Sequence, residues 1–337
     1  MIEVIPNIYL LQLPLPDVYL KYINIYLIPG DDKHLLIDTG WNTEESFDSL
    51  RRQLSEIGID FKDISQIVAT HIHPDHYGMA GRLKQLSKAK IALHYRDKEL
   101  IDLRYVDMDE LLQQMAQWFN TNGVPTEDML KLKTASVGMA KFVAPVLPDI
   151  TLQGGETITT GSFSLQVVWT PGHSPGHICL YEPTQKILIS GDHILPTITP
   201  NISLHPQSSN NPLDDYLNSL NQLKQLDVSL ILPAHGNPFT GLQQRIEELI
   251  LHHEQRKSEI LVKIKAKPKT AYQIATEISW MTDMNVNGVN WDDLTPLDKR
   301  IAVLEILAHL ESMRVGGKVA RFSRESIIYY QLPDITR

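Results

Sequence analysis

The heptapeptide THIHPDH at residues 70–76 brings three histidines and a carboxylate together directly after an apolar run. Because alternate residues of an extended segment face the same side, His71 and His73 can point at one ion. Asp75 and His76 follow the turn at the proline, toward a second position. Imidazole and carboxylate ligands suit zinc, iron or manganese and need no thiolate. The heptapeptide therefore predicts a metal site at the end of a strand.

Further residues of metal-ligand type follow other apolar runs, which alternate with helix-like segments along the chain. Mixed strands and helices indicate an α/β layered fold. Loops at strand ends gather at one edge of a sheet, where sites are built. The residues in question are Asp38, His173, Asp192 and His235. Two metal ions about 3.5–4 Å apart at such an edge would share a hydroxide and polarise a carbonyl or phosphoryl oxygen.

Taken in order, these motifs span residues 20–240 and resemble the metallo-β-lactamase superfamily, in particular its glyoxalase II and LACTB2-like branch. The resemblance implies a four-layer αββα sandwich with the site at one edge of its two sheets. It implies a first metal held by His71, His73 and His173, and a second held by Asp75, His76 and His235. Asp192 would bridge the two ions, and Asp38 would orient a ligand histidine by a hydrogen bond. Two zinc ions are expected, with iron or manganese as alternatives.

Departures from the family pattern narrow the chemistry. β-Lactamases of the commonest class carry a cysteine in the place of Asp192 and lack the histidine at His76, whereas Cys179 of this chain lies outside the motifs. Antibiotic hydrolysis is therefore not expected. The oxygen-reducing diiron branch replaces His73 with glutamate, which argues against that branch as well. The pattern is more similar to glyoxalase II, lactonase and RNase-type members.

The sequence thus predicts a hydrolase that uses a metal-bridging hydroxide to attack an acyl carbonyl in a thioester, lactone or related ester. Asp75 and Asp38 are the predicted catalytic carboxylates, and Asp75 would orient the hydroxide and pass its proton on. His193 and His205 are candidates for the wall of the substrate pocket. Two alternatives stay open, a single-strand-specific endoribonuclease of the LACTB2-like type and a mononuclear iron persulfide dioxygenase-like enzyme.

Two domains are expected. Residues 1–240 would form the catalytic domain, with a helical insertion at about 95–150 that contains several methionines. Methionine adapts to irregular apolar shapes, so this insertion either packs between helices or forms a wall over an apolar substrate. Residues 241–337 would form a smaller C-terminal domain.

The C-terminal segment shows the order of elements that is typical of a winged helix. A long helix is expected over Leu242–Ile264, and two further helices are expected after the capping residues Thr270 and Thr295. The chain would then turn at Gly316-Gly317 into a hairpin of two strands, residues 318–322 and 327–332. Such a module could bind nucleic acid or build a homodimer.

Composition limits the partners. The chain has 31 Lys+Arg and 40 Asp+Glu, for a formal net charge of −9, and the excess negative charge lies in residues 1–240. Surfaces that bind nucleic acid are normally basic, so a small acyl substrate is favoured over a nucleic acid. No apolar run is long enough for a membrane span, and a single cysteine forms no internal disulfide. A cytoplasmic location is the simplest interpretation.

Overall fold

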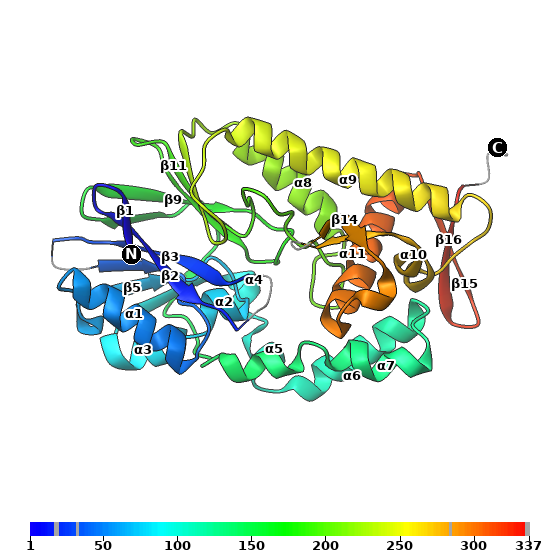
Figure 1. Ribbon diagram of the computed structural model, residues 1–337, viewed down its shortest axis with the longest axis horizontal. Helices are drawn as coiled ribbons and strands as arrows, with labels where there is room; N and C mark the ends of the chain where they lie inside the picture. The colour runs from blue at the N-terminus through cyan, green and yellow to red at the C-terminus, as the bar shows by residue number, and fades with distance from the viewer. Residues whose placement is uncertain (17–19, 32–33, 283–284, 334–337) are drawn as a thin grey trace.

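Two large β-sheets form the centre of the fold in the computed structural model (Figure 1). The structure describes residues 1–16, 20–31, 34–282 and 285–333. The first sheet has seven strands in chain order. The pairs β1–β2, β2–β3 and β3–β4 are antiparallel, and β4, β5, β6 and β7 run parallel to one another. The strands are β1 (Ile2–Ile5), β2 (Ile8–Pro14), β3 (Tyr22–Ile28), β4 (His34–Ile37), β5 (Ile64–Val68), β6 (Lys90–His94) and β7 (Ile150–Leu152).

The second sheet has five strands in the order β12-β11-β10-β9-β8. Only β11 and β12 pair in parallel, and the other neighbours are antiparallel. The strands are β8 (Thr157–Thr160), β9 (Phe163–Trp169), β10 (Ile178–Glu182), β11 (Ile187–Gly191) and β12 (Leu230–Pro233). In β9, buried residues alternate with exposed ones, as expected for a strand with one face on the core.

Helices cover the outer faces of both sheets. Helices α1 (Glu44–Glu56) and α3 (Ala80–Ser87) share an apolar core with the outer face of the first sheet. Helices α8 (Pro212–Leu223) and α9 (Leu242–Ile264) share one with the outer face of the second. A third core lies between the sheets and includes Tyr26, Ile37, Val68, Phe163, Leu180 and Ile189. The order helix, sheet, sheet, helix confirms the expected αββα sandwich.

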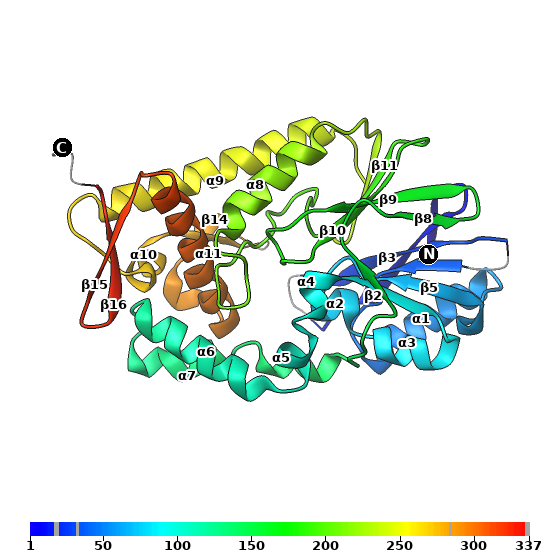
Figure 2. The same ribbon diagram turned by 180° about the vertical axis from the view of Figure 1, so that it is seen from behind.

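A helical segment follows β6, where the sequence predicted an insertion at about 95–150. It contains α4 (Tyr95–Lys98), α5 (Ile101–Tyr105), α6 (Met108–Thr121), α7 (Thr126–Thr134) and η2 (Val137–Phe142). Figures 1 and 2 both show α5, α6 and α7 running from the sandwich toward the C-terminal helices. Met115 is buried in the core of that region beside Phe119, so this methionine serves packing.

The C-terminal helices form where the sequence places their caps. Helix α10 (Ala271–Glu277) begins after Thr270 and α11 (Pro296–Val315) after Thr295, each with a reciprocal capping box. The remaining elements are η1 (Phe61–Asp63), α2 (Pro74–Tyr77), β13 (Trp280–Thr282), β14 (Asn285–Val289), η3 (Trp291–Asp293), β15 (Ala320–Arg324) and β16 (Ile327–Gln331). The winged-helix character of this segment stays a prediction.

The expected hairpin near the C-terminus forms, but its turn does not lie at the glycine pair. Gly316 ends α11, and the turn between β15 and β16 is formed by Glu325 and Ser326, both with positive φ. A two-residue turn with positive φ at both positions normally carries Asn-Gly or Asp-Gly. Glu325-Ser326 lacks that signal, which is why the Gly-Gly pair drew the prediction.

One apolar core joins the C-terminal helices to the sandwich. Buried residues of α9 and α11 belong to the same cluster as Cys179, Leu188 and Ile231 of the second sheet. The expected boundary at residue 240 lies just before α9, which begins at Leu242. Because one core spans both sides of this boundary, the division into two domains stays a prediction. In the part of the chain that the structure describes, we find no helix with the length and apolar character needed to cross a membrane.

Gly172 precedes a candidate ligand and is tightly packed against α8. Its φ is +134°, and a Cβ there would lie 2.6 Å from the Cα of Tyr216. Gly58 also has a positive φ, of +72°, but its Cβ position is open. We expect Gly172→Ala to lower the free energy of unfolding by about 3 kcal/mol and Gly58→Ala by about 1 kcal/mol, measured by urea denaturation. Equal losses would show that contact with α8 is not what requires glycine at residue 172.

Candidate metal centre

Strand directions bring the predicted ligands to one edge of the sandwich. In the first sheet β4 and β5 are parallel, so Asp38 and the 70–76 loop leave from the same edge. In the second sheet β11 and β12 are parallel, and β9 points the same way because both β9 and β11 are antiparallel to β10. His173, Asp192 and His235 therefore also follow strands that end at a common edge.

Three histidines form the first candidate ligand group. Nδ1 of His73 lies 2.9 Å from Nε2 of His71 and 3.0 Å from Nε2 of His173. Burial, followed by the charges of neighbouring histidines, holds the pKa values of His71 and His73 well below the ordinary value. The rings are therefore neutral near pH 7, as metal ligands must be. The three nitrogens converge closely enough to hold one metal ion.

A carboxylate and two histidines form the second candidate group. Short helix α2 begins at Pro74 and carries both Asp75 and His76. Oδ2 of Asp75 lies 3.2 Å from Nε2 of His235 and 3.6 Å from Nε2 of His76. These three atoms also lie close enough to one another to hold a metal ion.

Asp192 stands between the two groups. Its Oδ2 lies 3.5 Å from Nε2 of His173, in the first group. Its Oδ1 lies 3.4 Å from Nε2 of both His76 and His235, in the second. Burial raises the pKa of Asp192, but the charges of His76 and His235 outweigh burial and hold it well below the ordinary value. The backbone N–H of Asp192 donates to Nε2 of His177 at 3.2 Å, which holds the backbone at this position.

A metal ion would satisfy the donor atoms of the site better than hydrogen bonds among these atoms do. Nε2 of His76, Oδ1 of Asp192 and Nε2 of His235 are buried and have no hydrogen-bond partner among the described residues. A buried polar atom without a partner costs about 1–3 kcal/mol. A cation bound among these atoms would satisfy all three of them. Nitrogen and carboxylate oxygen without sulfur are the donors expected for zinc, iron or manganese.

Hydrogen bonds from behind hold the ligand rings in place. Oδ2 of Asp38 lies 2.8 Å from Nδ1 of His76, and the hydroxyl of Thr70 binds the same carboxylate. Asp38 reaches this position with a φ of +64°, which aspartate tolerates better than most residues. Nδ1 of His173 lies 2.9 Å from the carbonyl oxygen of Asn201, and Nδ1 of His235 lies 3.3 Å from that of Tyr22. Such partners fix the tautomer and the orientation of a ligand ring.

Asp97 is a buried residue of the site that the sequence analysis missed. Its carboxylate accepts from the backbone N–H of Ile72 at 2.9 Å, the hydroxyl of Ser174 at 2.9 Å and the backbone N–H of Gly176 at 2.7 Å. It thus ties the loop of His71 and His73 to the loop of His173. No motif could have revealed it, because two of its three partners are backbone groups distant in sequence.

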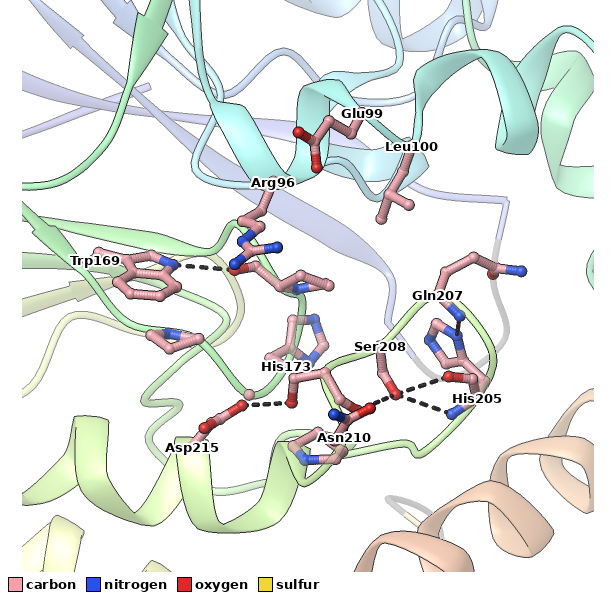
Figure 3. Close-up of a pocket in the computed structure, with 15 residues that line it drawn as sticks. Arg96, Glu99, Leu100, Trp169, His173, His205, Gln207, Ser208, Asn210 and Asp215 are labelled. Carbon is pink, nitrogen blue, oxygen red and sulfur yellow. Dashed lines mark hydrogen bonds between the residues drawn. The ribbon is translucent and has the colours of Figure 1, made fainter.

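A pocket opens beside the first ligand group. It has a volume of about 480 Å³ and includes His173 in its wall (Figure 3). Figure 3 shows His205, Gln207 and Ser208 on one loop, across the pocket from Trp169, a residue that is 36% exposed. The other lining residues are Arg96, Glu99, Leu100, Pro171, Gly172, Pro175, Ser209, Asn210, Pro212 and Asp215.

The two histidines expected at the pocket wall lie in different places. His205 lines the pocket, and its Nδ1 accepts from the backbone N–H of Gln207 at 3.2 Å. His193 is fully buried, with its ring against Tyr216, and does not line this pocket. Burial lowers the pKa of His193 to about 3.

Comparison with known proteins relates the chain to one protein family. A family model described as "Metallo-beta-lactamase superfamily" matches residues 18–235. Human acyl-coenzyme A thioesterase MBLAC2 is 31% identical over 232 residues, which are 64% of this chain and 74% of that protein. The probable metallo-hydrolase YqjP of Bacillus subtilis is 27% identical over 265 residues, which are 75% of this chain and 79% of that protein.

A solved structure extends the likeness to nearly the whole chain. A metallo-beta-lactamase family protein from Thermus thermophilus is 30% identical and superposes with a TM-score of 0.83, covering 98% of this chain and 100% of that one. The shared architecture therefore includes the helical segment after β6 and the C-terminal helices. Since the family model alone spans residues 18–235, the chain belongs to the metallo-beta-lactamase superfamily.

Proposed function

We propose that this chain is a metal-dependent hydrolase of acyl thioesters. The observation that carries the proposal is the placement of Asp192, which faces a ligand group with each of its carboxylate oxygens next to a substrate-sized pocket. That arrangement suits two divalent cations, and zinc is our first choice. The thioesterase named among the relatives supports an acyl thioester over a lactone as substrate. The acidic chain supports a small substrate over a nucleic acid.

Bound divalent cations would supply Lewis acidity toward a carbonyl oxygen and would lower the pKa of water. The residues of the chain supply the geometry for this chemistry. His71, His73 and His173 would hold one cation, Asp75, His76 and His235 the other, and Asp192 would contact both.

Asp75 is our candidate for the residue that takes up the proton. Its side chain keeps 15% of its surface exposed, so a proton received at the carboxylate can leave to solvent. Among the described residues, the carboxylate of Asp38 forms hydrogen bonds with Thr70 and His76, and it lies behind the ring of His76. In this proposal Asp38 is a positioning residue, because it cannot touch a substrate bound in front of that ring.

Removing the central carboxylate tests the proposed activity. Asp192→Asn is expected to lower the bound metal per protein and to reduce thiol release from butyryl-coenzyme A by at least about a hundredfold, because both cations lose a charged ligand. Metal content is measured by atomic emission and thiol release with a colorimetric thiol reagent. Asp227→Asn is the control, since Asp227 pairs with Lys186 at the surface. Cleavage of single-stranded RNA by the wild type, lost in Asp192→Asn and without thiol release, would contradict the thioesterase assignment.

A second variant tests the hydrogen bonds that join the two loops. Asp97→Asn replaces an acceptor of three hydrogen bonds with an amide whose NH2 group faces a donor. We expect metal affinity to fall about 10–100-fold, measured by competition with a chelator, because His71, His73 and His173 are then less well fixed. Asp102→Asn, an exposed residue on the neighbouring α5, is the matched control. Equal metal affinities in Asp97→Asn and the wild type would show that Asp97 does not position these ligands.

A further inference from the structure

Arg104 and Arg300 form no ion pair with a carboxylate among the described residues. Other arginines, such as Arg82, Arg245 and Arg314, form ion pairs with glutamates. The guanidinium of Arg104, on α5, forms no hydrogen bond or ion pair with any residue that the structure describes. Among the described residues, Arg300, on α11, donates only to the backbone carbonyls of Leu132 and Lys133, at 3.2 Å each. Within the described part of the chain, both cations therefore lack a directly paired carboxylate.

Asp97 is a carboxylate whose charge Arg104 influences. Burial raises the pKa of Asp97, and the charge of Arg104 acts in the opposite direction. The oxygens of Asp97 are already occupied by Ile72, Ser174 and Gly176, which donate three hydrogen bonds to them. The guanidinium of Arg104 therefore keeps its own donors available for another anion.

Contacts around Arg300 place it beside the loop that carries His205. Its guanidinium lies 5.7 Å from the ring centroid of Phe119 on α6. The preceding residue of α6, Trp118, donates its indole N–H to the carbonyl of Leu204 at 3.2 Å. The N–H of Leu204 donates in turn to the carbonyl of Leu304, one turn along α11 from Arg300. His205, which follows directly, forms part of the pocket wall together with His173.

Contacts around Arg104 place it beside the first ligand group. The next residue, Tyr105, donates its hydroxyl to the carbonyl of Ile72 at 2.6 Å, between His71 and His73 in the sequence. The end of α5 therefore rests directly on the loop that carries those two ligands. In Figure 1, α5 lies below α2 and α4, and α11 runs toward α6 and α7.

Electrostatic effects agree with these positions. Burial, then the charges of Arg104 and Arg300, holds the pKa of His205 well below its ordinary value. Burial, then Arg104, lowers the pKa of Arg300 to about 10. Burial, then His173 and Arg104, lowers the pKa of His73. The charge of Arg104 thus acts on Arg300, His205 and His73, and the charge of Arg300 acts on His205, in agreement with the contacts described above.

We infer that Arg104 and Arg300 form an anion-binding subsite, which holds a phosphate or carboxylate of the thioester substrate beside the metal centre. This inference rests on the proposed function. Two partly buried cations without a paired carboxylate are unfavourable, and an anionic group of the substrate would relieve that cost. Guanidinium groups match the geometry of phosphate and carboxylate oxygens. The local positive charge also offsets the net charge of −9, which by itself repels anionic substrates.

The anion could belong to the carrier thiol or to the acyl group, and three substrates separate these sources. Butyryl-N-acetylcysteamine has no charge, butyryl-coenzyme A has a phosphorylated carrier, and succinyl-N-acetylcysteamine has a carboxylate on its acyl group. Arg104→Gln is expected to raise KM for one or both anionic substrates about tenfold, and to change KM for the neutral substrate much less. Added salt should lower kcat/KM for an anionic substrate more in the wild type than in Arg104→Gln.

Control variants separate charge from structure. Arg314→Gln removes an arginine from α11 that is already paired with Glu311, and it should leave all three KM values unchanged. Arg300→Lys keeps the charge of Arg300 and should retain most of the preference for anionic substrates. Arg104→Gln should keep the melting temperature of the wild type, because its guanidinium has no hydrogen bond or ion pair to lose among the described residues. An equal change in KM for neutral and anionic substrates in Arg104→Gln would overturn the subsite.

A binding measurement separates this inference from the proposed function. S-methyl-coenzyme A has a capped thiol, so calorimetric titration reports its binding without turnover. Binding that is lost in Arg104→Gln, with no hydrolysis of any thioester, would support the subsite and contradict the thioesterase assignment. Hydrolysis of thioesters at rates that do not depend on Arg104 for any of the three substrates would support the thioesterase and overturn the subsite.

Discussion

The position of one carboxylate, that of Asp192, determines how the two groups of imidazoles are arranged. Its oxygens lie within 3.5 Å of ring nitrogens in both groups, and the charges of His76 and His235 keep it ionised in a buried place. An ionised carboxylate in that environment is tolerated only where positive charge surrounds it. The parallel strands β11 and β12 deliver Asp192 and His235 to this point together. The sandwich can therefore be understood as the scaffold that keeps these groups together.

A ring of hydrogen bonds outside the ligands keeps the arrangement rigid. Asp38 holds His76, and backbone carbonyls hold His173 and His235. Asp97 joins the two loops that come from different sheets. These contacts require backbone conformations that most residues avoid, such as the positive φ of Asp38 and the close approach of Gly172 to α8. The packed cores on both sides of each sheet stabilise these strained positions.

Much of the centre could be predicted from sequence, because its ligands are chemically distinctive and each follows a strand. The alternation of strands and helices and the capped helices were predictable for a similar reason, since apolar periodicity and capping residues are local signals. The sandwich itself was expected from the resemblance of the motifs to a known family. Asp97 and the pair Arg104 and Arg300 could not be predicted. Their importance arises from contacts between segments far apart in the chain, and a single aspartate or arginine carries no local signal. The hairpin turn at Glu325-Ser326 was missed because neither residue carries the usual local signal for a turn with two positive φ angles.

We expect Asp192 to join two metal positions. Anomalous diffraction from crystals of the zinc-loaded protein, recorded on both sides of the zinc absorption edge, is the sharpest test. We expect two peaks, one among His71, His73 and His173 and one among Asp75, His76 and His235. Asp192 would lie within about 2.0–2.2 Å of each peak. A single peak, or two peaks of which Asp192 touches neither, would contradict this expectation.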